Sequence, residues 1–106
     1  MNVPQFFLYL EKSIEAGTQW VVFEPNTATT WLRVRVSVEN FLSQIWRAGD
    51  LAGATPAEAY RVRVGLGMTM TETDIDLGLL ITEVAVAPAE PAEFVVFRIS
   101  HKRLTE

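Results

Sequence analysis

The segment LLITEVAVAPAEPAEFVVFRI, Leu79–Ile99, decides the fold of this chain. Two β-prone runs, Leu79–Val86 and Phe94–Ile99, are separated by the turn sequence APAEP. Proline and small residues favour a turn, whereas Val, Ile and Phe favour strands, so we expect an antiparallel hairpin. The second run lies near the C-terminus and includes four contiguous uncharged residues, Phe94 to Phe97. A last strand is often an edge strand, and an edge this apolar favours pairing with another chain.

Helical and strand patterns alternate upstream of this hairpin. Residues 2–17 predict a first helix, because apolar residues recur at three- and four-residue spacing and Gly17 can cap its end. Thr18–Phe23 is apolar on both faces, which predicts a central strand covered on each side. A long helix is predicted to begin near Thr27–Thr30 and to end at Gly49. Its apolar stripe comprises Trp31, Val34, Val38, Phe41, Leu42 and Ile45.

Three shorter elements are predicted between the long helix and the hairpin. Thr55 to Glu58 forms a capping box with Pro56 at the first helical position. Tyr60–Val64 alternates with period two and predicts a half-exposed strand, and residues 69–78 predict a short acidic helix. We therefore expect one α+β domain over residues 1–106, with two layers. Its sheet is predicted to be mixed, with about four strands, packed by two main helices and accompanied by short helical turns.

Composition excludes several classes of protein. The 106 residues are enough for one core, and 49% are hydrophobic against 21% charged, which is typical of a globular domain. The net charge of −4 argues against a nucleic-acid partner. Without cysteine there is no disulfide, thiolate zinc site or Cys nucleophile, which suits a reducing cytoplasm. No apolar run reaches the length of a membrane span and the start, MNVPQ, lacks a basic signal region, so we expect an intracellular product with no membrane partner.

An acidic segment comes closest to a metal motif. Glu72, Asp74, Asp76 and Glu83 occupy positions 1, 3, 5 and 12 of a calcium-loop template. The sixth position requires glycine but holds Leu77, and the residues after Glu83 favour a strand instead of a second helix. We interpret the acids as a helix N-terminus, where carboxylates are stabilised by the helix dipole, and expect no metal.

The other candidate sites are weak. Gly65 and Gly67 lack the third glycine of a nucleotide loop and read as a turn, so no cofactor is expected. His101, the only histidine, is interpreted as a solvated residue of a basic tail, because it has no predicted cleft or orienting partner. Glu24 is explained by turn chemistry with Pro25. The tryptophans could stack on bases or sugars but are assigned to the core; they are Trp20, Trp31 and Trp46.

Read together, four segments resemble the C-terminal domain of the tail sheath proteins of contractile phage tails and related bacteriocin-like injection particles. They are FFLYLEKSIEAGTQWVVFEPN (Phe6–Asn26), FLSQIWRAGDLAGATPAEAY (Phe41–Tyr60), TETDIDLGLL (Thr71–Leu80) and VAVAPAEPAEFVVFRI (Val84–Ile99). Each segment alone is modest evidence for the resemblance, but the order and spacing of all four together are specific to the family. The sequence departs from the family at residues 65–67, where a polar or acidic residue usually follows the strand.

The resemblance implies a mechanical function without catalysis. Sheath subunits stack as rings around an inner tube, and their contraction drives the tube through an envelope. Neighbours are joined by terminal arms that add strands to the sheet of this domain. Whole sheath proteins are longer, so the chain is expected to be the inner domain without its upstream arm and outer domains. The residues expected in or near the exchanged sheet are Glu93, Phe94, Val95, Val96, Phe97, Arg98, Ile99, His101, Lys102 and Arg103.

The same resemblance implies partners and a location. The expected partners are identical sheath subunits and the inner tail tube protein, with baseplate and tail terminator proteins at the ends of the sheath. Assembly is expected in the bacterial cytoplasm, and the product is a virion tail or a contractile injection particle. Two other readings remain open from the residues. One is a small intracellular adaptor that captures a partner's strand, and the other is a small enzyme using Glu24 or Glu83.

Overall fold

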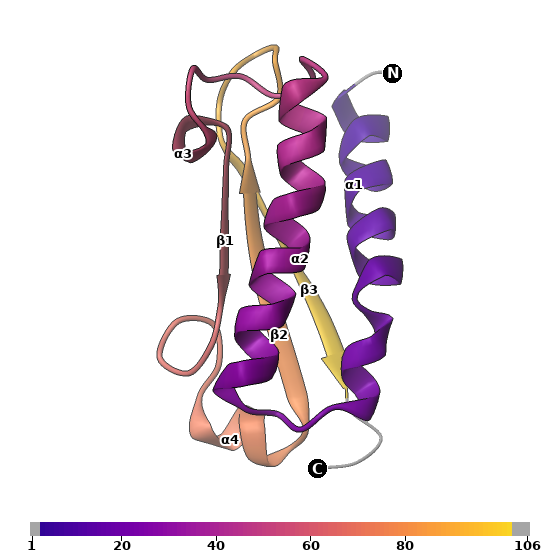
Figure 1. Cartoon of the computed structure of the whole chain (residues 1–106), viewed down its shortest axis with the longest axis vertical. Coiled ribbons are helices and arrows are strands. Elements are labelled where there is room, and N and C mark those ends of the chain that lie inside the picture. The colour runs from indigo at the N-terminus through magenta and orange to yellow at the C-terminus, as the bar shows by residue number, and fades with distance from the viewer. Residues whose placement is uncertain (1–2, 103–106) are drawn as a thin grey trace.

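The computed structural model describes residues 3–102, and these form two long helices packed on an antiparallel sheet (Figure 1). The helical elements begin with α1 (Val3–Gly17), a 3₁₀ helix η1 (Gln19–Phe23) and α2 (Ala28–Arg47). Two short helices, α3 (Pro56–Ala59) and α4 (Glu72–Asp76), flank the first strand. The strands are β1 (Tyr60–Val64), β2 (Leu79–Val86) and β3 (Val95–Lys102).

The sheet in the described residues has three strands in the order β1-β2-β3, and both pairings are antiparallel. Tyr60 pairs with Val86 at one end of β1, and Leu79 pairs with Lys102 at the start of β2. The predicted α+β architecture and the hairpin are confirmed. The prediction of a mixed sheet of about four strands is wrong in detail, because one predicted strand is a helix.

That segment is Thr18–Phe23, which follows α1 and forms η1. Val21 is fully buried, whereas Phe23 at the end of the turn is 75% exposed. A short apolar run indicates burial but does not distinguish a strand from a buried helical turn. The 3₁₀ turn buries Val21 in the core without adding a strand to the sheet.

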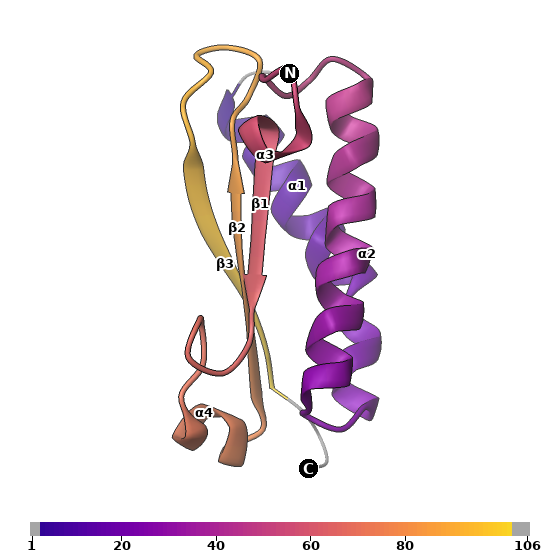
Figure 2. The ribbon, with the colours of Figure 1, turned by 60° about the vertical axis from the view of Figure 1, so that its left-hand side comes forward.

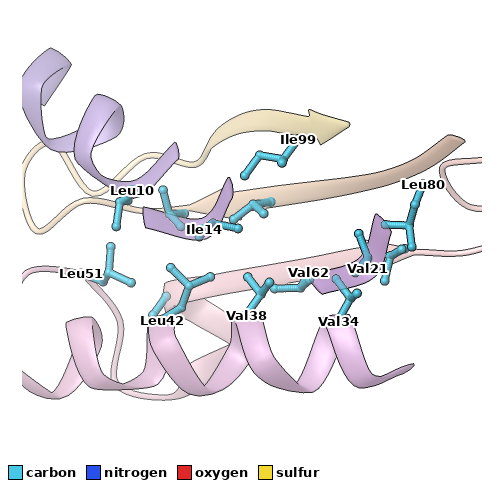
Figure 3. Packing of buried hydrophobic residues seen from close by; sticks show 14 of the residues in the cluster. Leu10, Ile14, Val21, Val34, Val38, Leu42, Leu51, Val62, Leu80 and Ile99 are labelled. Atoms are coloured by element: carbon cyan, nitrogen blue, oxygen red, sulfur yellow. The ribbon is translucent and has the colours of Figure 1, made fainter. Parts of the chain in front are cut away.

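Both long helices lie on the same face of the sheet, so the domain has two layers (Figure 2). Leu10 and Ile14 of α1 and Val34, Val38 and Leu42 of α2 point into the layer between helices and sheet (Figure 3). On the sheet side, alternate residues complete the core, since the side chains of a strand alternate between its two faces. These are Val62, Val64, Leu80, Val84, Val86 and Ile99. The other face of the sheet carries no layer of described residues.

The predicted caps of the two short helices are confirmed, whereas the predicted cap at Gly17 is wrong, because Gly17 is the last helical residue of α1 and does not adopt a positive φ. The backbone N–H of Thr55 donates to Oε2 of Glu58 at 3.2 Å, and a second capping box links Thr71 with Asp74 at the start of α4. The loop between α2 and α3 is tied to the end of the hairpin, because Leu51 bridges Pro88. This end of the elongated domain is thus held by a loop that pairs with the hairpin.

Candidate functional site

The outer edge of β3 is a free strand edge in the described part of the chain. β3 pairs with β2 along eight residues and has no strand on its other side. The apolar residues at its beginning are only partly covered, since Phe94 and Val95 are each 39% exposed and Val96 is 57% exposed. The position of β3 as an edge strand confirms the sequence prediction, and the strand is longer than expected because it continues to Lys102.

The ten residues expected in or near the exchanged sheet divide into three groups. Those whose side chains are exposed on or before β3 are Glu93, Phe94, Val95, Val96, Arg98 and Lys102. Phe97 is half-buried and packs on the core, while Ile99 and His101 are buried, so they face the helices. Arg103 lies outside the described residues. A neighbour at this edge would meet main-chain groups along all of β3 but few of its inward side chains.

A second free edge, which sequence reasoning missed, runs along β1. β1 pairs only with β2 in the described residues, and a groove of about 670 Å³ follows its open side. The groove is lined by Arg35, Glu39, Asn40 and Ser43 of α2 and by Tyr60–Arg63 of β1, among others. The alternating pattern YRVRV did indicate a half-exposed strand, but the strand order that leaves it at the edge depends on long-range pairing.

His101 is buried, with 4% of its surface exposed, so its interpretation as a solvated tail residue is wrong. Its Nε2 lies 2.7 Å from Oγ1 of Thr18, which in turn donates to the carbonyl of Ile14 at 2.7 Å. Burial lowers the pKa of His101 below its ordinary value of 6.5, and the charge of Glu15 opposes that shift. The residues around His101 in the sequence are polar, but the register of β3 points His101 inward.

Glu83 organises the outer face of the sheet. Its Oε1 is 3.3 Å from Nη1 of Arg63 on β1, and its Oε2 is 2.9 Å from Nη2 of Arg98 on β3. The register places these three residues in one row across the sheet, because Arg63 pairs with Glu83 and Glu83 with Arg98. The carboxylate is only 17% exposed, so it is held between the two guanidinium groups.

The other sequence candidates have structural partners. Glu24 pairs with Arg33 at 3.1 Å. Of the calcium-template acids, Asp74 serves the cap of α4 and Glu83 lies on β2, beside the two arginines. Within residues 3–102, no group of three or more His, Asp or Glu side chains could hold a metal ion. No helix in that same range is long and apolar enough to cross a bilayer.

The three tryptophans pack against the core, as expected, and each indole N–H has a partner. Nε1 of Trp20 donates to the carbonyl of Gly17, and that of Trp46 to the carbonyl of Gly53. Nε1 of Trp31 donates to Oδ1 of Asn26 at 2.7 Å, and the amide of Asn26 donates to the carbonyl of Leu79. Asn26 therefore connects the start of α2 to the start of β2.

Comparison with known proteins places these features in a family. The family model for the phage tail sheath C-terminal domain matches residues 1–102. A chain in the six-fold symmetrised cryo-EM structure of the anti-feeding prophage (AFP) baseplate is 42% identical, with a TM-score of 0.77 over 91% of this chain. A chain of the PVC sheath complex in the contracted state, from an extracellular contractile injection system, is 39% identical, with a TM-score of 0.76 over 89% of this chain.

This chain covers 27% of each of those two longer chains. No curated protein matches it significantly. The family comprises the C-terminal domains of phage tail sheath proteins. Since the family match extends over nearly all of the sequence and the fold agrees with both structures, the chain belongs to the phage tail sheath C-terminal domain family.

Proposed function

We propose that this chain is the inner domain of a contractile sheath subunit, which polymerises around an inner tube and contracts to drive the tube through an envelope. Membership of the sheath family supports this proposal, as does similarity to a chain of a sheath complex in a contracted state. In this proposal the domain has no catalytic role, and its function is to join subunits. The observation that carries the proposal is the free, apolar edge of β3.

Strand exchange is the proposed means of joining. A strand from a neighbouring subunit adds to the outer edge of β3, and main-chain hydrogen bonds supply the attachment. The residues involved are Glu93–Ile99 with His101, Lys102 and Arg103. Because main-chain pairing does not depend on particular side chains, such a joint can persist while the outer parts of subunits rotate. The free edge of β1, with the groove beside it, offers a second acceptor on the same sheet.

The proposed partners follow from this role. They are identical sheath subunits, the inner tail tube protein, and the baseplate and tail terminator proteins at the two ends. The AFP neighbour comes from a baseplate structure, which supports a baseplate contact in this protein. Assembly takes place in the bacterial cytoplasm, before the particle is released as a virion tail or an injection particle. The upstream arm and outer domains of a whole sheath subunit would account for the remaining length of the two similar chains.

Amide hydrogen exchange tests strand exchange at this edge. In the free chain, main-chain amides of β3 that do not pair with β2 should exchange rapidly. In assembled sheath containing the chain they should become strongly protected, because each gains a partner carbonyl. Amides on the exposed side of α2 provide the control, since an α-helix satisfies them in both states. Equal exchange of β3 amides in the two states would contradict the proposal.

A further inference from the structure

The outer face of the sheet is basic in a chain that is acidic overall. Four exposed cations project from it, Arg61 and Arg63 on β1 and Arg98 and Lys102 on β3, whereas the net charge of the chain is −4. Among the strand residues on this face, Glu83 is the one carboxylate, and it pairs with Arg63 and Arg98. Two arginines sharing one carboxylate retain a net positive charge. We call these four cations with Glu83 the basic face.

An apolar spot lies beside these charges at one end of the sheet. Val96 is 57% exposed and is in the same row as Arg61, since Arg61 pairs with Ala85 and Ala85 with Val96. Phe94 is 39% exposed, and the guanidinium carbon of Arg61 lies 4.6 Å from the centre of its ring. Arg61 has no carboxylate partner within residues 3–102. A ligand that matches this surface therefore presents an apolar side chain surrounded by carboxylates.

The other end of the molecule presents an apolar side chain beside carboxylates. α4 carries Glu72, Asp74 and Asp76, and the next residue, Leu77, is 61% exposed. Asp74 is occupied by the cap, whereas Glu72 and Asp76 are exposed and form no ion pair within residues 3–102. We call Glu72, Asp76 and Leu77 the acidic end. An exposed leucine flanked by free carboxylates is complementary to an exposed valine and phenylalanine flanked by arginines.

The two surfaces of one chain cannot meet each other. α4 lies at the end of the molecule where β2 begins, whereas Arg61 and Val96 lie opposite Ala85, near the end of β2 (Figure 1). Ala85 is six positions after Leu79 on β2, which corresponds to about 20 Å along the strand. A contact between them therefore requires a second copy displaced along the direction of the strands.

We propose that the basic face binds the acidic end of a second copy of this chain, with Leu77 of one copy on Val96 and Phe94 of the other. Such an interface joins two different surfaces, so each added copy leaves one surface of each kind free. Heterologous contacts of this type build open helical or linear arrays instead of closed pairs. The contact uses the face of the sheet and side-chain charges, whereas strand exchange uses the edge and main-chain groups. It therefore goes beyond the proposed joint and can be tested independently of it.

Disulfide trapping tests this contact in the isolated chain, which has no cysteine of its own. A Val96→Cys chain and an isotope-labelled Leu77→Cys chain are mixed under mild oxidation, and the dimers are separated by mass. The proposal predicts that the mixed dimer is the main product and that its yield falls at high salt. A Val36→Cys chain mixed with the same Leu77→Cys chain is the matched control, because Val36 is 45% exposed but lies on α2.

Charge reversal tests the electrostatic part of the same contact, because each reversed chain is compared with its own cysteine parent. Glu72→Lys and Asp76→Lys in the Leu77→Cys chain should lower the rate of trapping by about two- to fivefold for each ion pair lost. Arg61→Glu and Arg98→Glu in the Val96→Cys chain should restore it. A mixed dimer no more abundant than the Val36→Cys control would overturn the proposal. A predominance of Val96→Cys homodimers would also overturn it, since the sheet would then pair with itself.

Discussion

Nε2 of His101 on β3 lies 2.7 Å from Oγ1 of Thr18 at the end of α1, and both side chains are buried. The hydroxyl of Thr18 donates to the carbonyl of Ile14, so its oxygen is left to accept the N–H of His101. This assigns the proton of neutral His101 to Nε2. The last strand is thereby attached to the first helix in the same chain, and its outward edge remains available to a neighbour.

Removing the hydroxyl of Thr18 tests this attachment. Thr18→Val leaves the buried N–H of His101 without an acceptor, and we expect the free energy of unfolding to fall by about 1–3 kcal/mol. Thr29→Val on the exposed side of α2 is the control and should change stability little. Urea denaturation of the three proteins measures both effects. Equal stability of Thr18→Val and the parent chain would show that the bond contributes nothing.

Burial of His101 also predicts a pH dependence. Its pKa in the folded chain is lowered below 6.5, so below that pH the unfolded chain binds the proton more readily. The contribution of neutral His101 to stability is therefore complete above pH 6.5 and is lost as the pH falls through 6.5 towards the lower folded pKa. Urea unfolding at several pH values should show this decline in the parent chain and less of it in His101→Gln. Parallel profiles for the two proteins would contradict the assignment.

The row Arg63–Glu83–Arg98 predicts that one carboxylate contributes more than an ordinary surface ion pair. Glu83→Gln removes two pairings at once, and we expect a loss of about 1 kcal/mol in the free energy of unfolding. Glu39→Gln, which removes the 3.5 Å pair with Arg35 on α2, is the matched control with an expected loss of about 0.3 kcal/mol. Raising the salt concentration should reduce both losses. A larger effect at Glu39 would contradict this reading.

Gly53 is predicted to be intolerant of any side chain. Its φ is +105°, and a Cβ there would lie 2.7 Å from Cβ of Glu58 and 2.9 Å from its carbonyl carbon. Gly53→Ala should therefore destabilise the chain by more than about 2 kcal/mol. Gly49→Ala, where φ is +90° and a Cβ meets nothing within 4 Å, should cost only about 1 kcal/mol.

Trp46 gives a local signal for the same pair of variants. Its indole N–H donates to the carbonyl of Gly53 at 2.9 Å, so displacement of that loop should change the contribution of Trp46 to the tryptophan fluorescence, which Trp20 and Trp31 share. The spectrum should change in Gly53→Ala before global unfolding and remain close to the parent in Gly49→Ala. Similar stability losses in the two variants would show that the clash with Glu58 is relieved at little cost.

Much of this fold could be predicted because its signals are local. The stripe on α2, the capping box at Thr55 and the alternation of Tyr60–Val64 each depend on residues within a few positions. The 3₁₀ turn at Gln19–Phe23 could not be predicted in this way, since its apolar run is equally compatible with a strand. Its conformation depends on how α1 and α2 meet.

The candidate site likewise has features that local sequence predicts and features that depend on long-range pairing. The apolar, β-prone residues Phe94–Phe97 predict a strand, and its place as the last of the predicted strands predicts that it lies at an edge. The burial of His101 depends on the pairing of β3 with β2 and on Thr18, which lies 83 positions away in the sequence. The outer-face row around Glu83 and the free edge of β1 likewise depend on strand order. A sequence can show that a residue is polar, but the register of a sheet decides which face it occupies.

A helical reconstruction of assembled sheath containing this chain tests most directly whether a neighbour's strand joins the edge of β3. We predict a strand from an adjacent subunit lying along β3, with main-chain hydrogen bonds to Phe94–Ile99. A reconstruction in which Phe94–Ile99 contacts only its own subunit would contradict it.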